Sequence, residues 1–560
     1  MTLSTESPKL PWAISNIVQQ VHGLPIWGTI LSISVLVVLH YAIYAVYSIT
    51  FHPLAKYPGP KVAAMTRIVY TSHLLSGRLV KFLHQTHQKY GAVVRVAPNE
   101  VIFTSSQAWN DIYNVRQGAP EMSKDTPLYQ GLGTPPTIAE AGHDLHRRYR
   151  RLLAKGFSEA GLREQEPVIQ QKISVLIKQL HAEAANGGTP EMTSWFNVVA
   201  YSIQFFTFDL ISELTFGESF KCLENGRFHP WILMVTQSIK FRAIIQALGY
   251  YPLLFKLFMG LIPKSYQEAF RDHQKLTSEN VQRRIDKKVN YTDLASSLID
   301  PKHNLERYEI DGNCAVLIVA GSETTTTALS ATMYYLTQNP EAKAKVTKEV
   351  RSSFSSAEEI TAISVNQLKY LPACFNEAMR KLPPAPAVFS RRVPKEGAYI
   401  AGNWIPGGTH VGMCHFATNI SSLNFKDPEK YVPERWLGDP EYEDDARAAM
   451  QVFSVGPRNC IGQNLARLEL RLLLSRVIWE FDWELDPASV GWDKDMPVYL
   501  SWGLCNPGHV SFTKLEPVVW VQLNWVNAQV KGAEQDEEKA AWELSGYTSY
   551  VLQGPGTSKI

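Results

Sequence analysis

Cys460 is the residue whose surroundings most clearly indicate chemistry. It lies in the segment 453–462, which reads FSVGPRNCIG and precedes a Leu- and Arg-rich helical pattern over residues 463–481. A metal-binding cysteine must be a thiolate, whereas a free thiol with a pKa of about 8.5 is mostly protonated at neutral pH. A position just before a helix points backbone N–H groups and the positive end of the helix dipole at the sulfur. Gly456 and Gly462 permit a tight turn and a close approach of the backbone to a bound group. We therefore expect a thiolate metal ligand here.

The segment carries five fixed positions in the pattern F-x-x-G-x-R-x-C-x-G, namely Phe453, Gly456, Arg458, Cys460 and Gly462. An ordinary loop cysteine near a helix start is the alternative, but it would not require this combination. The pattern resembles the haem-binding loop of the cytochrome P450 family, the haem-thiolate monooxygenases. The resemblance implies that Cys460 binds the iron of heme b (iron protoporphyrin IX), that Arg458 pairs with a haem propionate, and that the other three positions bind the cofactor.

A second motif reads AGSETTTT over residues 320–327. Threonines are poor helix formers, and their hydroxyls can bond back to carbonyls of the preceding turn, so we expect a local distortion of a long helix. The motif resembles the family pattern A-G-x-[DE]-T-T. This likeness implies that Thr324 hydrogen-bonds a water or the oxygen being activated, and that Glu323 relays protons from solvent. A surface Ser/Thr-rich helix is the alternative.

A third motif, Glu377-x-x-Arg380, places opposite charges on one helix face, and Arg435 follows in the segment PERW. In this order before the cysteine loop, the three residues resemble the buried Glu-Arg-Arg network of the family. The resemblance assigns them to stability of the scaffold rather than to catalysis.

Weaker similarities extend the haem site. His146 and Arg150 occupy the family's W-x-x-x-R positions that contact haem propionates, with His in place of Trp, and Arg391 matches the propionate-binding Arg after the third motif. Both 146 and 150 lie in HRRYRRLL, residues 146–153, whose basic residues favour a helix with one strongly charged face. Such a face is either simply solvated or serves the haem and an acidic partner.

Composition limits the class of protein. The chain has 560 residues, 45% hydrophobic and 19% charged, and a net charge of +2. These proportions are typical of a globular protein with a large core and leave no basic footprint for nucleic acid. The six cysteines include no C-x-x-C pair, so a zinc site and a secreted disulfide framework are both disfavoured.

Residues 23–51 contain no Asp, Glu, Lys or Arg, and their apolar run is long enough to cross a bilayer core of roughly 30 Å. A cleaved signal peptide, the alternative, would have an apolar region of only about 7 to 15 residues. Lys56, Lys61 and Arg67 follow the run and only Lys9 precedes it, so we expect a single-pass anchor with the catalytic domain in the cytosol. The resemblance to microsomal relatives implies the endoplasmic reticulum.

The expected organisation has one large domain behind the anchor, since no internal repeat or Gly/Ser linker interrupts residues 62–517. The expected fold is mostly α with a smaller β-rich part, the cytochrome P450 fold, and a β-hairpin is predicted around Pro98-Asn99. The predicted segments are a short N-terminal piece (1–22), the transmembrane anchor (23–50), a Pro/Gly hinge (51–61), the haem-thiolate domain (62–517) and a C-terminal extension of unknown role (518–560).

The predicted activity is insertion of one atom of dioxygen into an apolar small molecule, by hydroxylation or epoxidation. The basic block at 146–151, the anchor with its PGP entry and AGSETT resemble fungal members from secondary metabolism, including hydroxylases of trichothecene-type terpenoids. No flavin or nicotinamide motif is evident, so the resemblance implies a separate NADPH-cytochrome P450 reductase as electron donor, with the basic block as part of its docking surface. Alternatives are an oxygen-independent haem-thiolate isomerase or dehydratase, which the intact Glu323-Thr324 pair argues against, and a non-enzymatic haem-binding membrane protein.

Substrate contacts are predicted from Leu317, Ala320, residues 387–389 and the loop 499–504, with residues 120–140 as a lid. The apolar stretch 250–263 is too short to span a membrane and is predicted either to dip into its surface or to form a buried helix.

Overall fold

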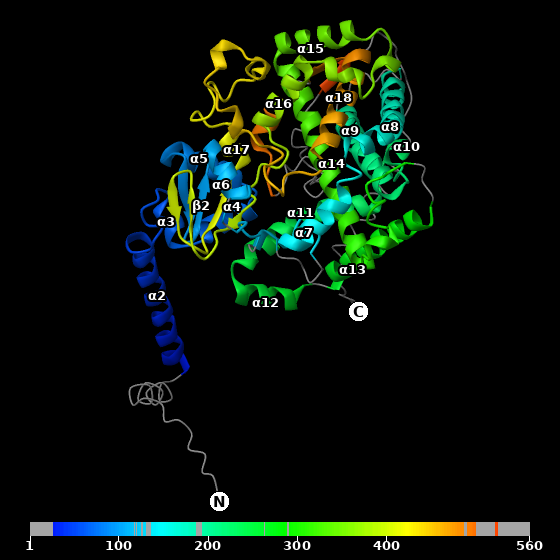
Figure 1. Ribbon diagram of the computed structural model, residues 1–560. Helices are drawn as coiled ribbons and strands as arrows, with labels where there is room; N and C mark the ends of the chain where they lie inside the picture. Colours follow the sequence, from blue (N-terminus) through cyan, green and yellow to red (C-terminus); the bar gives the residue numbers. More distant parts are fainter. Residues whose placement is uncertain are drawn as a thin grey trace, which may run out of the picture.

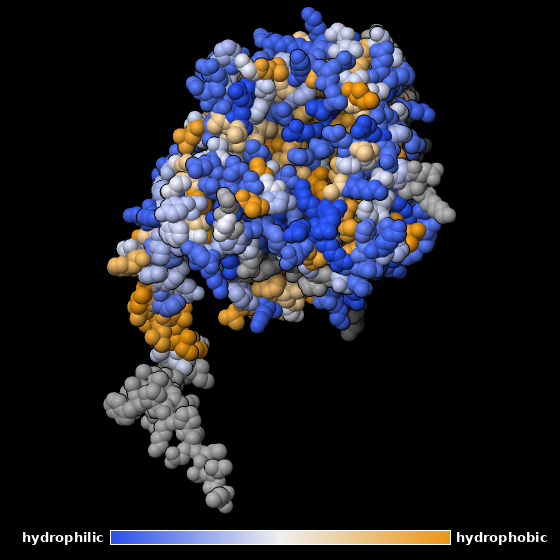
Figure 2. All heavy atoms as spheres, viewed as in Figure 1, coloured by the Kyte–Doolittle hydropathy of each residue, from blue (hydrophilic) through white to orange (hydrophobic). Residues whose placement is uncertain are grey.

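A single apolar helix projects from the body of the protein in the computed structural model (Figure 1), which describes residues 26–499 apart from 117, 119, 125–126, 130–135, 186–192, 263, 288–290 and 486–489, together with 521–524. This helix, α2, runs from Ile26 to Thr50. Its stretch Trp27–Thr50 has a mean hydropathy of 2.1, and Ser48, near its end, is the one residue of this stretch that is buried. Figure 2 shows the helix as an apolar column outside an otherwise mostly polar surface. Length, composition and exposure together make α2 a candidate membrane anchor.

The end of α2 and the segment after it are fixed against the body. The Ser48 hydroxyl donates to the Ala64 carbonyl at 2.6 Å, and the Arg95 guanidinium donates to the Ser48 carbonyl at 2.7 Å. A Cβ on Gly59 would lie 2.2 Å from the carbonyl oxygen of Arg95, so the chain can pass this close only without a side chain. Arg67, counted above among the charges that orient the anchor, is buried in an ion pair with Glu100. It therefore stabilises the fold at this junction.

The smaller part of the protein is built on a four-stranded sheet in the order β1-β2-β6-β3. β1 (Val93–Ala97) and β2 (Glu100–Phe103) pair antiparallel, which confirms the predicted hairpin, and β6 (His410–Met413) runs parallel to β2. β3 (Arg391–Arg392) closes the other edge. Figure 1 places this sheet beside the helices that precede and follow β1 and β2: α3 (Lys61–Met65), α4 (Ile68–Leu75), α5 (Leu79–Tyr90) and α6 (Ser106–Tyr113).

Two further pairs of strands complete the β structure that is described. β4 (Ala398–Ile400) pairs with β5 (Asn403–Ile405), and β7 (Asp482–Leu485) pairs antiparallel with β8 (Val521–Asn524). β8 lies within the segment 518–560 that was set apart above as an extension.

The larger part is helical and surrounds α14, which runs from Arg307 to Gln338 (Figure 1). Although α14 is long and apolar enough to cross a membrane, most of it is buried, so it is the central core helix. The other helices are α7 (His143–Leu153), α8 (Glu159–Ala185), α9 (Thr193–Phe216), α10 (Cys222–Asn225), α11 (Pro230–Gly249), α12 (Pro252–Leu261), α13 (Lys264–Asp286), α15 (Pro340–Ser353), α16 (Tyr370–Lys381), α17 (His415–Asn419), α18 (Gln463–Glu480) and α19 (Trp492–Asp495).

α12 differs from the other helices because none of its residues is buried. Leu253, Leu254, Leu257 and Leu261 all expose more than half of their surface. The alternative that residues 250–263 form a buried core helix is therefore wrong. Figure 1 shows α12 on the same lower side of the body from which α2 projects.

Candidate functional site

The loop that carries Cys460 is a tight turn held by its own backbone. The N–H of Cys460 donates to the carbonyl of Phe453 at 2.8 Å, and the N–H of Asn459 donates to the carbonyl of Gly456 at 3.1 Å. Gly456 has a φ of +76°, and a Cβ there would lie 2.2 Å from the carbonyl oxygen of Tyr113. Glycine is therefore required at 456 because the loop packs against the end of α6. The expected close approach of Gly456 is to this protein backbone.

The thiol of Cys460 lies directly before α18, for which Gly462 is the N-cap residue. Burial raises the pKa of Cys460, while a hydrogen bond from the backbone of Gly462 and the charge of Arg150 act in the opposite direction. The local helix effect predicted from the sequence is present, but burial outweighs it, so an anionic sulfur needs a further positive charge such as a metal ion.

Cys460 is nevertheless exposed, whereas Cys222, Cys314, Cys374 and Cys414 are buried. The surrounding protein still desolvates the Cys460 thiol, and this burial is the largest influence on its pKa. A Cβ on Gly462 would lie 4.0 Å from the sulfur. The absence of a side chain at 462 therefore keeps the surroundings of the sulfur open.

Arg150, on α7, holds the cysteine loop in place. Its guanidinium donates to the backbone carbonyl of Asn459 at 2.6 Å and also to the side-chain oxygen Oδ1 of Asn459. The sequence motif predicted a contact of Arg150 with the cofactor, whereas its described partners belong to the residue next to Cys460.

Positive charge gathers next to this loop, from elements far apart in the sequence. Burial and the charges of Arg391 and Arg458 lower the pKa of Lys124 to about 6. Burial, followed by Arg458, Lys124 and Arg150, lowers the pKa of His146 to about 4, so its ring is neutral at pH 7. The structure thus brings His146, Arg150, Arg391 and Arg458 together, and it adds Lys124. A cluster whose members disfavour one another's charge is suited to a bound anion.

The neutral and acidic partners of this cluster do not fully balance its positive charge. Arg458 pairs with Glu121 and donates to the Ala141 carbonyl at 2.8 Å, while Arg391 donates to the Tyr129 hydroxyl at 2.8 Å. Glu121 also binds His143 at 2.7 Å. Neither Lys124 nor Glu121 belongs to a recognised motif, and no pattern in the sequence would have indicated them.

The second motif lies midway along α14. The helix is continuous from Arg307 to Gln338, so the threonines do not break it, and the local distortion of its hydrogen bonds stays a prediction. The threonine hydroxyls do bond back as expected, with Thr324 donating to the Ala320 carbonyl at 2.7 Å and Thr327 to the Glu323 carbonyl at 2.8 Å. Ala320 is exposed although the helix is mostly buried, and Thr324, one turn farther along the same face, is partly exposed.

Glu323 lies on a different face of α14, against α9. Its carboxyl oxygen Oε1 accepts a hydrogen bond from the Gln204 amide at 3.0 Å. Burial raises the pKa of Glu323 to about 7, and the hydrogen bond from Gln204 limits the rise. A carboxyl with this pKa exchanges protons at neutral pH, as a proton relay requires. The sequence motif indicated Glu323 but could not indicate Gln204, which lies 119 residues earlier.

A second buried acid, Glu469 on α18, was also missed. Burial raises its pKa to about 8, and a hydrogen bond with Thr325 opposes this rise. A Glu between Leu465 and Leu472, both buried on the same helix, was a signal that could have revealed it.

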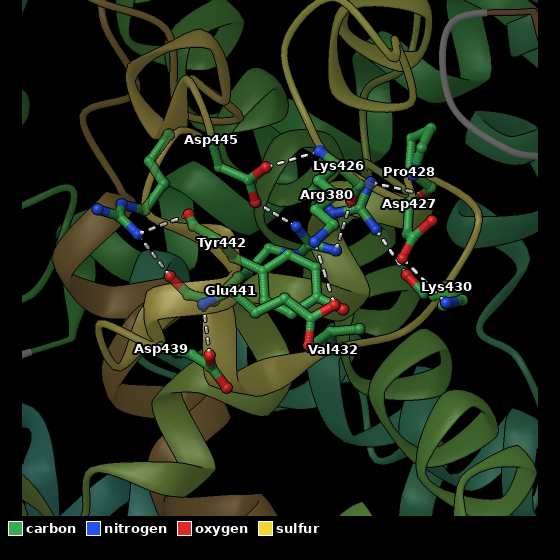
Figure 3. A network of polar contacts seen from close by, with 12 residues as sticks. Arg380, Lys426, Asp427, Pro428, Lys430, Val432, Asp439, Glu441, Tyr442 and Asp445 are labelled. Carbon is green, nitrogen blue, oxygen red and sulfur yellow. Dashed lines mark hydrogen bonds and ion pairs between the residues drawn. The ribbon is translucent and has the colours of Figure 1, made fainter.

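The third motif forms a closed network of buried charges (Figure 3). Glu377 receives two hydrogen bonds of 2.9 Å from Arg380 and one of 3.0 Å from Arg435, and all three side chains are fully buried. Figure 3 shows the guanidinium of Arg380 also directed at the backbone around Pro428 and Lys430. Burial alone would raise the pKa of Glu377, but Arg380 and Arg435 outweigh it and the pKa is lowered. This network joins α16 to the segment before the cysteine loop.

The predicted substrate contacts are only partly described. Leu317, Ala387 and Val388 are buried, whereas Phe389 is partly exposed. Of the loop 499–504 the structure describes Tyr499 alone, and the remaining five positions lie outside the described residues, as do eight of the residues in the predicted lid at 120–140.

Comparison with known proteins identifies the family. Residues 58–507 match the sequence profile described as Cytochrome P450. The chain belongs to the cytochrome P450 family. The cytochrome P450 monooxygenase cpaH of Aspergillus oryzae is 57% identical over 468 residues, 84% of this chain and 90% of that protein. The averantin hydroxylase of Dothistroma septosporum is 39% identical over 81% of this chain and 86% of that protein. The trichothecene C-15 hydroxylase of Fusarium sporotrichioides is 37% identical over 82% of this chain and 92% of that protein.

These relatives establish the protein as a P450 monooxygenase, an oxidoreductase that depends on haem and resembles enzymes of fungal secondary metabolism. The residues present fit such a cofactor. The thiol of Cys460 is exposed at the start of α18, and the guanidinium groups of Arg391 and Arg458 lie close to its loop beside Lys124, as two propionate groups would require. The predicted family, fold class and enzyme class are therefore confirmed.

Proposed function

We propose that the thiolate of Cys460 is the axial ligand of heme b in this P450 monooxygenase. The observation that carries the proposal is the exposure of this one thiol, at the start of α18, in an environment that otherwise desolvates it. A thiolate in that position receives the hydrogen bond from the backbone of Gly462 and the charge of Arg150. Phe453, Gly456 and Gly462 shape the loop around the sulfur, and Arg150 fixes it through Asn459.

The propionates of the haem would be held by Arg458 and Arg391, with His146 as a neutral hydrogen-bond donor and Lys124 as an additional cation. Support for this assignment comes from the lowered pKa values of Lys124 and His146, which burial and then the neighbouring positive charges cause and which two carboxylates would oppose. Glu121 already occupies one side of Arg458 and orients it.

When bound, the haem supplies the redox chemistry, which is to take up electrons one at a time and activate dioxygen for insertion into the substrate. Thr324 presents its hydroxyl on the accessible face of α14 beside Ala320 and is proposed to hydrogen-bond the oxygen or a water there. Glu323, with its pKa near neutrality, is proposed to deliver protons to this site.

Replacing Thr324 with Ala is expected to lower the product formed per NADPH consumed by about tenfold, because a positioned proton-transfer group is lost. Electrons should instead appear as hydrogen peroxide, measured alongside NADPH oxidation. Thr332→Ala is the matched control, because Thr332 makes the same backward hydrogen bond to the Ala328 carbonyl at 2.7 Å farther along α14. Equal coupling in the two variants would contradict the assignment.

Electrons are proposed to come from an NADPH-cytochrome P450 reductase. Arg147 and Arg151 on α7 are exposed, while Arg150 of the same helix contacts the cysteine loop. An acidic partner bound to these two arginines would lie one helix away from the sulfur ligand.

The proposed location is the membrane of the endoplasmic reticulum, with α2 as a single-pass anchor and the catalytic domain in the cytosol. The exposed leucines of α12 are proposed to contact the same membrane, since Figure 2 shows apolar surface at the lower side of the body as well as on α2.

The α12 contact can be tested with a fluorophore attached to a Leu257→Cys variant in vesicles that contain brominated lipid. Strong quenching is expected at 257, because its side chain would lie among the acyl chains. Leu423→Cys is the matched control, since Leu257 and Leu423 are both 64% exposed. Absence of quenching at 257, or equal quenching at both positions, would refute the contact.

The proposed substrate is an apolar small molecule of a fungal secondary-metabolite pathway. Two relatives are named as hydroxylases, one of averantin and one of a trichothecene at C-15. The exposed Ala320 and the apolar Leu317 on the same helix would suit a substrate bound mainly by hydrophobic contact.

The overall reaction is tested by supplying microsomes, the reductase, NADPH and ¹⁸O-labelled dioxygen with candidate metabolites. One labelled oxygen atom in the product is expected. An unlabelled rearranged product would favour the isomerase or dehydratase, and haem binding without any product from the candidates would favour the non-enzymatic haem protein.

A further inference from the structure

A buried polar seam runs between α9 and α14 on the side of α14 that carries Glu323. Its first contact is the 3.0 Å hydrogen bond from the Gln204 amide to the Glu323 carboxyl. Its second is a 2.8 Å hydrogen bond between the hydroxyls of Thr207 and Thr326, one turn farther along both helices. Gln204, Thr207 and Thr326 are almost completely buried. Most buried polar side-chain atoms in proteins have a hydrogen-bond partner, as these contacts provide here.

Close packing of the two helices brings the seam together. A Cβ on Gly321 would lie 2.7 Å from the Cδ1 atom of Ile211 and 2.8 Å from its Cγ1 atom. The helices can therefore approach this closely only because residue 321 has no side chain. Gln204, two turns before Ile211 on α9, then reaches the carboxyl of Glu323 on α14.

Gln204 is an uncharged partner for an acid that changes protonation near neutral pH. A glutamine amide can donate a hydrogen bond to a carboxylate, and after rotation its oxygen can accept one from the protonated acid. The Oε1 atom of Gln204 is buried and has no hydrogen-bond partner among the described residues, so it is available for the second role. A Lys or Arg in this position would instead hold Glu323 in its ionised form.

Other ionisable groups around the seam are engaged elsewhere. Asp209 on α9 accepts the backbone N–H groups of Cys222 and Leu223, and Glu469 on α18 hydrogen-bonds with Thr325. Within the part of the chain that the structure describes, Glu323 forms no ion pair. Its side-chain hydrogen-bond partner there is Gln204.

We propose that Gln204 is a positioning residue that holds the Glu323 carboxyl in one orientation in both of its protonation states, and so keeps it ready to deliver protons. The proposal rests on the proposed function of Glu323 as proton relay. It assigns to α9 a part in oxygen activation that no sequence motif indicates. Gln204 occupies one carboxyl oxygen, Oε1, which leaves Oε2 for proton exchange.

The decisive variant is Gln204→Met, which keeps the side-chain volume and removes both hydrogen-bonding atoms. The pH of full-length protein loaded with haem would be varied while infrared spectroscopy follows the bands of protonated carboxyl groups. The band that is missing in Glu323→Gln belongs to Glu323, and the band that is missing in Glu469→Gln belongs to the other buried acid. A hydrogen bond donated to a carboxylate stabilises the charged form, so its loss raises the pKa. The titration midpoint of Glu323 is expected to move up by about one pH unit.

Thr207→Val is the matched control, because it removes a buried hydroxyl from the same seam without touching Glu323. It should leave the Glu323 midpoint unchanged. An unchanged midpoint in Gln204→Met, or an equal shift in both variants, would overturn the proposal. If Gln204→Met does not fold, Gln204→Glu is titrated instead: its second carboxyl must raise the Glu323 midpoint if the two side chains are in contact, and no rise overturns the proposal.

Turnover gives the second readout. With a substrate identified by ¹⁸O incorporation, Gln204→Met should form about threefold less product per NADPH than Thr207→Val. Raising or lowering the pH should not restore the product formed per NADPH in Gln204→Met. Equal coupling in these two variants would overturn the role in proton delivery. Failure of the wild-type protein to incorporate oxygen would instead refute the proposed function, whereas the infrared titration tests the contact of Gln204 with Glu323 without any turnover.

Discussion

Replacing Cys460 with Ser is expected to abolish oxygen insertion while leaving the chain folded. The loop is held by backbone hydrogen bonds and by Arg150, none of which involves the sulfur. A serine hydroxyl remains neutral at pH 7 and cannot donate electron density as a thiolate does, so product formation should fall to the background of the assay. Product formation and haem content per chain are the measurements.

Cys414→Ser is the matched control for this change. The Cys414 thiol is buried and donates a weak hydrogen bond to the Pro386 carbonyl at 3.7 Å, a role that serine can take over. It should retain haem and activity. A Cys460→Ser variant that still inserted oxygen, or a Cys414→Ser variant that lost it, would contradict the assignment of the ligand.

Replacing Glu377 with Gln is expected to lower the free energy of unfolding by about 3 to 5 kcal/mol, the typical cost of leaving buried charges unpaired. The lost carboxylate serves Arg380 and Arg435, which are fully buried, and it also accepts the indole N–H of Trp436 at 2.9 Å. Urea unfolding followed by the haem absorption and by tryptophan fluorescence measures the change.

Glu434→Gln is the matched control, since Glu434 forms a half-exposed ion pair with Lys345 in the same region. Pairs of this kind contribute about 0 to 1 kcal/mol. A comparable loss in both variants would show that Glu377 has no special role.

The network also predicts a direction for acid sensitivity. Because the pKa of Glu377 is lowered in the folded state, its contribution to stability is present above the pKa of the unfolded chain and is lost as the pH falls through the folded value. Wild-type protein should therefore lose more stability on acidification than Glu377→Gln does.

Local patterns in the sequence predicted the elements whose structure is decided locally. The turn at Cys460, the hairpin at Pro98-Asn99 and the apolar helix α2 each depend on residues adjacent in the chain. The backward hydrogen bonds of the threonines were foreseen for the same reason. These bonds do not end the helix, which continues to Gln338.

Contacts between distant segments could not be predicted. Lys124 meets Arg391 and Arg458, and Gln204 meets Glu323, across separations of more than one hundred residues. Burial, which depends on the whole fold, also reversed the expected pKa shift of Cys460. Arg67, counted from the sequence as a charge that orients the anchor, is instead buried in an ion pair with Glu100. The sequence motifs identified chemistry, while the surroundings that tune it come from tertiary structure.

The most direct test of the central claim is the absorption spectrum of the purified, reduced protein with carbon monoxide bound. A cysteine thiolate opposite the carbon monoxide is predicted to give the long-wavelength Soret band of a thiolate-ligated haem, and this band should be absent in Cys460→Ala. A band typical of histidine ligation, or a thiolate band that persists in Cys460→Ala, would contradict the account.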